Sequence, residues 1–153
     1  MKTIIMSLGG SVIVPDKIDT KFLRSFKKII NKFIKKNFRF AVYCGGGKIA
    51  RDYQKGASKI VNLSNKDLDW MGIHATRLNS NLMKILFGKI AEDKIVINPT
   101  TKIIFNKKIL IAALLLTATL APAATLLPSH LRTDGKDVQK AFASAAEAAP
   151  SEQ

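Results

Sequence analysis

The sequence is poor in the residues that build disulfides and metal sites. Its 153 residues include one cysteine, Cys44, and two histidines, His74 and His130. A single cysteine excludes an internal disulfide and any site held by several thiolates. Two histidines so far apart in the chain disfavour a histidine-rich metal centre. Acidic residues are also few, 11 against 25 Lys and Arg, and the net charge is +14. This excess suits anionic partners such as phosphates, nucleic acid or an acidic membrane surface.

An abrupt change of composition near Ala112 divides the chain. Residues 1–111 contain 18 Ile and 5 Ala, whereas residues 112–153 contain no Ile and 12 Ala. We interpret the change as a junction left by a fusion, a frameshift or an artefact, and a natural Ala-rich extension is the alternative. Three parts are therefore expected: a folded part over 1–112, an apolar Ala/Leu-rich segment over 113–127, and a flexible polar tail over 128–153.

The folded part alternates apolar runs with amphipathic segments. Residues 3–8 and 38–44 predict buried strands that stop at glycines. Helices are predicted over 20–36, 48–61 and 66–88, and further short strands over 95–97, 102–105 and 109–112. This order indicates an α/β fold with a mostly parallel sheet and helices on both faces. Ligands on such sheets bind at the carboxyl ends of the strands, where both glycine clusters fall.

The two glycine clusters, Gly9-Gly10-Ser11 and Gly45-Gly46-Gly47, each follow a predicted strand directly. Glycine permits positive φ and lets the backbone approach a ligand closely. The second cluster also opens a helix, where free N–H groups and the helix dipole attract a phosphate. Lys48 and Arg51 add positive charge within one turn. Neither cluster is a Walker A loop or a Gly-x-Gly-x-x-Gly fingerprint, so a tight strand-to-helix turn is the alternative for each.

The helix predicted over 66–88 carries a second group of polar candidates. Asp69 and Arg77 are eight residues apart, so they project within about 80° of each other, with Asn79 nearby. A carboxylate can accept hydrogen bonds from a ribose or a base, and an arginine can fork onto a phosphate. Ordinary surface charge is the alternative for these residues.

In order and spacing these segments resemble the amino-acid-kinase family. Its members have a strand ending in Gly-Gly-Ser, a strand ending in Gly-Gly-Gly, and an acidic residue followed by a Thr-Arg-x-Asn helix. The corresponding segments here are residues 7–12, 43–53 and 69–79. Within the family the chain is most similar to the archaeal-type uridylate (UMP) kinases, over residues 1 to about 113. That is roughly the first half of a full-length member, so the resemblance implies a truncated amino-acid-kinase fold.

The resemblance implies phosphoryl transfer from ATP to UMP, which gives UDP for pyrimidine nucleotide biosynthesis. It implies magnesium bound with ATP and no protein-bound metal, a cytoplasmic location, and a homo-oligomer, because full-length members form hexamers. It assigns no catalytic residue. By motif, the ATP phosphates would lie against Gly9, Gly10, Ser11, Gly46, Gly47 and Arg51. UMP would bind at Gly45 and Asp69, and Lys48, Arg77 and Asn79 would have a phosphate-binding or structural role.

After Ala112 the chain departs from the family, whose members continue with an acceptor loop and an ATP-binding half. We therefore expect little or no turnover by this chain alone, with weak binding of UMP or phosphate. One alternative is a non-catalytic module that binds anions or nucleic acid through the basic face over 27–39, which includes most of the helix predicted over 20–36. Nucleic acid is disfavoured, because the aromatic residues of that helix fall on its apolar stripe. The other alternative is a membrane-associated chimera, tethered through the uncharged run over 109–127.

Overall fold

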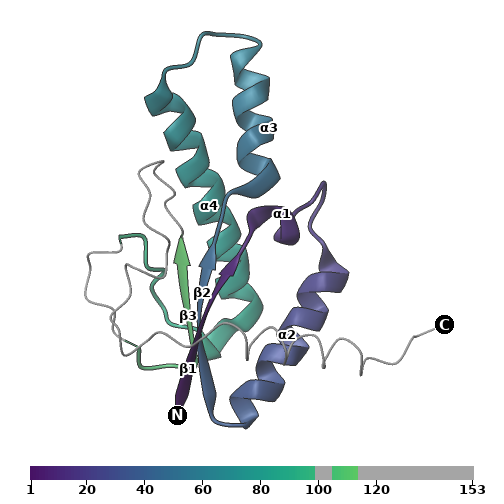
Figure 1. Ribbon diagram of the computed structural model, residues 1–153, viewed down its shortest axis with the longest axis vertical. Helices are drawn as coiled ribbons and strands as arrows, with labels where there is room; N and C mark the ends of the chain where they lie inside the picture. The colour runs from purple at the N-terminus through teal and green to yellow at the C-terminus, as the bar shows by residue number, and fades with distance from the viewer. Residues whose placement is uncertain (99–104, 114–153) are drawn as a thin grey trace, which may run out of the picture.

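The computed structural model describes residues 1–98 and 105–113 (Figure 1). A parallel three-stranded sheet lies at its centre and consists of β1 (Lys2–Leu8), β2 (Phe38–Cys44) and β3 (Ile109–Ala113). The strand order is β1-β2-β3, so β2 is hydrogen-bonded on both sides. The predicted α/β class with a parallel sheet is thus confirmed.

The register of the sheet aligns the carboxyl ends of its strands. Leu8 at the end of β1 lies opposite Cys44 at the end of β2, and Cys44 lies opposite Ala113 at the end of β3. The chain therefore leaves β1 and β2 at the same edge of the sheet. Both glycine clusters begin at that edge.

Within residues 1–98 and 105–113, five helical segments accompany the sheet. They are α1 (Gly10–Ile13), α2 (Thr20–Lys35), α3 (Gly47–Ser58), α4 (Asn65–Phe87) and the 3-10 turn η1 (Gly88–Ile90). Figure 1 shows α3 and the first half of α4 side by side, extending beyond the carboxyl edge of the sheet. This α3–α4 hairpin therefore stands above the edge where the glycine clusters lie.

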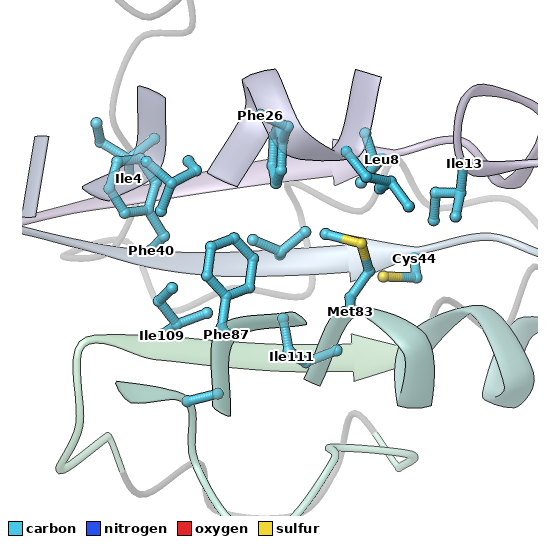
Figure 2. Packing of buried hydrophobic residues seen from close by; sticks show 14 of the residues in the cluster. Ile4, Leu8, Ile13, Phe26, Phe40, Cys44, Met83, Phe87, Ile109 and Ile111 are labelled. Carbon is cyan, nitrogen blue, oxygen red and sulfur yellow. The ribbon is translucent and has the colours of Figure 1, made fainter. Parts of the chain in front are cut away.

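The core fills the space between the sheet and the helices α2 and α4. Phe40 of β2 belongs to this core, and the rings of Phe26 from α2 and Phe87 from α4 meet edge to face in the same cluster (Figure 2). Helices α2 and α4 therefore share one face of the sheet. Because Met83 and Ile111 are also completely or almost completely buried, α4 is fixed firmly against β2 and β3.

Local sequence explains where the two long helices begin. The Asp19 carboxylate accepts a hydrogen bond from Phe22 N at the start of α2 (2.9 Å). At the start of α4, Ser64 and Asp67 form a reciprocal capping box. Such caps satisfy N–H groups that have no acceptor within the helix.

Three details differ from the sequence predictions. Helix α3 begins at Gly47 and ends at Ser58, three residues before the predicted end. Residues 95–97 do not form a strand, because only Val96 bridges to β3. The short helix α1 was not predicted, since four residues are too few to show a helical period. Most of the strand predicted over 102–105 lies outside the described residues, and so do residues 114–153.

Candidate functional site

The two glycine clusters lie in direct contact at the carboxyl edge of the sheet. A Cβ atom built on Gly10 would overlap the carbonyl oxygen of Gly45 and would lie 2.6 Å from Gly47 N. A Cβ atom on Gly47 would overlap the backbone of Gly10 and Ser11. The loops can therefore approach this closely only because both positions are glycine. The structure brings together the two clusters that the sequence singled out, and we call this contact the glycine pair.

The backbone of the second cluster has the conformation of an anion-binding nest. Gly46 is in the right-handed helical region, with φ −75° and ψ −35°, and Gly47 has φ +61°. Successive residues in right- and left-handed conformations turn their N–H groups toward a common point, where an anion can bind. The Gly45 N–H is already occupied, because it donates to Leu8 O (3.1 Å). The N–H groups that follow open α3, where no acceptor exists within the helix.

Asn79 of α4 contacts this loop from the interior. Its Nδ2 donates to Gly45 O at 2.8 Å and to Gly46 O at 3.3 Å, and the residue is 1% exposed. Thr76, one turn earlier on α4, is also buried, and its hydroxyl lies close to Gly46. Of the two roles left open for Asn79 by the sequence, these contacts match the structural one.

Two basic side chains of α3 lie near the glycine pair. Arg51 donates from Nη2 to the Ser11 hydroxyl at 3.0 Å, and so links α3 to the first cluster. Lys48 Nζ lies 2.7 Å from a carboxylate oxygen of Asp52 and 3.2 Å from one of Asp16. The hydrogen bonds with Asp52 and then Asp16 raise the pKa of Lys48. The ammonium group is thus paired with carboxylates, whereas the exposed Arg51 guanidinium donates to a neutral hydroxyl.

Asp69 and Arg77 lie on α4. Asp69 is exposed near the beginning of the helix, and Arg77 is half-buried two turns later. A groove of about 460 Å³ lies between α3 and α4, and neither Asp69 nor Arg77 is part of its lining. The groove is mainly apolar and aromatic, with Tyr53 on α3 facing Trp70 and Leu78 on α4. Neither Gly10 nor Gly47 lines the groove, although Ile49, two residues after Gly47, does.

Comparison with known proteins gives the family. The family model described as the amino acid kinase family matches residues 2–132, most of the chain. The chain belongs to the amino acid kinase family.

Archaeal uridylate kinases are among the relatives that it matches. It is 39% identical over 88 residues to a uridylate kinase of Thermococcus onnurineus strain NA1, which covers 58% of this chain and 38% of that protein. It is 40% identical over 85 residues to a uridylate kinase of Thermoplasma acidophilum, with 56% and 36% covered. The chain thus spans less than two fifths of the length of these relatives.

A solved structure shows the same fold. The crystal structure of a uridylate kinase from Archaeoglobus fulgidus superposes with a TM-score of 0.58 and 30% sequence identity. The superposition covers 73% of this chain and 50% of the other. The predicted membership of the amino acid kinase family is confirmed, and so is the similarity to the uridylate kinases within it.

Cys44 lies at the end of β2, directly below the glycine pair. Its side chain is completely buried, and burial raises the pKa of the thiol to about 12. A thiol with this pKa is protonated at neutral pH and is a poor nucleophile. Cys44 therefore fills space in the core.

Two features of the site were not predicted from the sequence. The contact between Gly10 and Gly47 depends on how closely the two loops approach. The pairing of Lys48 with Asp16 joins residues 32 positions apart. The contact of α4 with the second cluster did have a signal in the sequence. Asn79 comes three residues after Thr76, so both lie on one face of the helix.

The uncharged run over 109–127 is only partly described. Its first five residues form the buried strand β3. Over residues 1–98 and 105–113, no helix has both the length and the hydropathy needed to cross a membrane. The rest of the run and the tail over 128–153 lie outside the described residues.

Proposed function

We propose that residues 1–113 form the acceptor-binding half of a UMP kinase-type phosphotransferase, which transfers the terminal phosphoryl group of ATP to UMP. The observation that carries the proposal is the glycine pair at the carboxyl ends of β1 and β2, with its anion-binding nest at Gly46 and Gly47. The 39% identity to a uridylate kinase over 88 residues supports UMP as the acceptor.

The glycine pair suits a phosphate chemically. The N–H groups of Gly46 and Gly47 can donate hydrogen bonds to phosphate oxygens. The positive end of the α3 dipole, which lies at the same place, also favours a negative charge there. The Arg51 guanidinium, held beside Ser11, can add a charge-assisted bond. Because no Cβ projects from Gly10 or Gly47, the two loops can pack backbone against backbone, which brings Ser11 and Arg51 beside the second cluster. Phosphoryl transfer depends mainly on this kind of positioning and charge neutralisation.

The remaining site residues keep their proposed roles in binding the nucleotides. Asp69 is exposed and free to accept hydrogen bonds from the ribose or uracil of UMP, and Arg77 lies two turns further along α4. Among residues 1–98 and 105–113, no three His, Cys, Asp or Glu side chains gather into a metal site. The similarity to uridylate kinases supports magnesium as an ion that arrives with the phosphates of ATP.

We further propose that the 153-residue polypeptide binds nucleotide but turns over little or not at all by itself. The relatives it matches are more than twice as long as the aligned region. In the described residues the sheet ends at β3, and the glycine pair supplies contacts to phosphates but no enclosed site for an adenine. An ATP held only by its phosphates would not be aligned with the acceptor.

Nuclear magnetic resonance with the purified chain tests the binding proposal. We expect UMP to shift the amide signals of Gly46, Gly47 and Lys48, and uridine, which lacks the phosphate, to leave them in place. Unchanged signals at millimolar UMP would contradict the proposal. In parallel, UDP formation from UMP and ATP with magnesium is expected to stay at background, and robust turnover would contradict the second proposal.

A further inference from the structure

The Asn79 side chain is the direct link between α4 and the loop of the nest. It is almost completely buried, although it carries two polar groups, and its amide nitrogen contacts two successive backbone carbonyls. An amide NH2 has two hydrogens, so it can serve both acceptors at once. A hydroxyl could serve only one, and a carboxylate would repel both. Of these three groups, only an amide can therefore donate to both carbonyls from this position.

These two hydrogen bonds also fix the direction of the next two N–H groups. All peptide bonds in the described residues are trans. In a trans peptide the C=O of one residue and the N–H of the next point in opposite directions. When Asn79 holds the carbonyls of Gly45 and Gly46 toward α4, the N–H groups of Gly46 and Gly47 must point away from α4. An anion bound in the nest would therefore lie on the side of the loop away from α4.

We infer that Asn79 is the positioning residue of the anion-binding nest. It does not touch the phosphate and acts through the loop: its amide orients the peptides whose N–H groups bind the anion. The inference rests on the proposed function for the identity of the anion, but the loop conformation that it predicts does not depend on any ligand.

The same helix offers a matched control. Asn81 is two residues further along α4 and exposed, and its Nδ2 donates to Arg77 O within the helix (3.0 Å). Asn79→Asp and Asn81→Asp each replace an amide by a carboxylate on the same helix and change the net charge equally. Only the first removes the donor from the Gly45 and Gly46 carbonyls.

The first readout is the loop itself, without ligand. We expect Asn79→Asp to shift the amide signals of Gly46 and Gly47 and to increase their backbone mobility in heteronuclear relaxation, while Gly56 at the far end of α3 is unchanged. Asn81→Asp is expected to match the wild type at all three glycines. A wild-type loop in Asn79→Asp would overturn the inference, whether or not UMP binds.

The second readout is the affinity for UMP, with inorganic phosphate as the simpler probe. We expect Asn79→Asp to weaken both by about tenfold or more, and Asn81→Asp to change them less than about twofold. A role confined to stability would lower the melting temperature but leave the affinity of the folded protein intact, and that result would also overturn the inference. If Asn79→Asp does not fold, Asn79→Ala removes the donor without adding charge, and the same two readouts are measured on that variant. Absence of UMP and phosphate binding in the wild type would count against the proposed function, while the loop readout would still decide the role of Asn79.

Discussion

Replacing Gly10 by alanine should loosen the contact between the two glycine clusters. The new Cβ would lie 2.5 Å from the carbonyl carbon of Gly46 and 2.6 Å from Gly47 N, where ordinary contacts are 3.4–4 Å. Both neighbours are backbone atoms, so no side-chain rotation can relieve the overlap. The loops must separate by about 1 Å.

The magnitude follows from three contributions. Inserting a methyl group into a tight contact costs about 2–3 kcal/mol. The shift of the second loop also weakens its hydrogen bonds to Asn79, at about 1 kcal/mol. Alanine offsets about 0.5–1 kcal/mol of this, because it restricts the unfolded chain and favours the helical conformation of α1. We expect Gly10→Ala to lower the free energy of unfolding by about 2–3 kcal/mol.

The neighbouring glycine provides the control for this prediction. The nearest atom to a Cβ on Gly9 is Val12 Cγ2 at 3.9 Å, and Gly9 has an extended conformation that alanine adopts without strain. Gly9→Ala should therefore change the free energy of unfolding by less than about 0.5 kcal/mol. Urea denaturation followed by circular dichroism measures both variants. Equal stability of Gly9→Ala and Gly10→Ala would refute the close packing of the two loops.

Three further predictions concern other parts of the structure. Gly47→Ala should lower the free energy of unfolding by about 1–2 kcal/mol for the positive φ alone. Gly56→Ala, with no atom within 4 Å of its Cβ, should stabilise α3 by about 0.5–1 kcal/mol. Thermal denaturation of the two variants checks this, and equal melting temperatures would contradict it. Burial raises the Cys44 pKa from its ordinary value of 9.0 to about 12, so the unfolded chain loses this proton first and stability should fall as the pH rises from about 9 to 12. Unfolding curves at pH 8 and 10.5 should show a smaller fall in Cys44→Ala, and an equal fall would contradict the assignment. Asp16→Asn should release Lys48 from one carboxylate and tighten UMP binding modestly at low salt, by less than about threefold; weaker binding would show that the ion pair supports the site.

Much of the fold could be predicted from the sequence, because its determinants are local. The apolar runs that end at glycines indicated β1 and β2, and the parallel order followed from the helices between the strands. Parallel strands end at the same edge, so both glycine clusters were expected at the carboxyl ends of the strands. The actual register of Leu8 with Cys44 confirms this reasoning.

The details of the site could not be predicted in the same way. An apolar pattern shows that a residue is buried and does not show which atoms it meets. Asn79 lies 34 positions after Gly45, and its two hydrogen bonds depend on how α4 crosses the end of β2. The prediction of a strand over 95–97 was wrong for a related reason. A segment with strand propensity forms a strand only if it pairs with a neighbour, and here only Val96 bridges to β3.

The most direct test of the account is calorimetric titration of the purified 153-residue chain with UMP, with AMP as the control, followed by ATP with magnesium. We predict that UMP binds weakly and that AMP binds more weakly still. We expect ATP to bind no more tightly than contacts to its phosphates alone would hold it. If neither UMP nor ATP released heat with a correctly folded chain, the glycine pair would not be a phosphate site, and the central claim would be wrong.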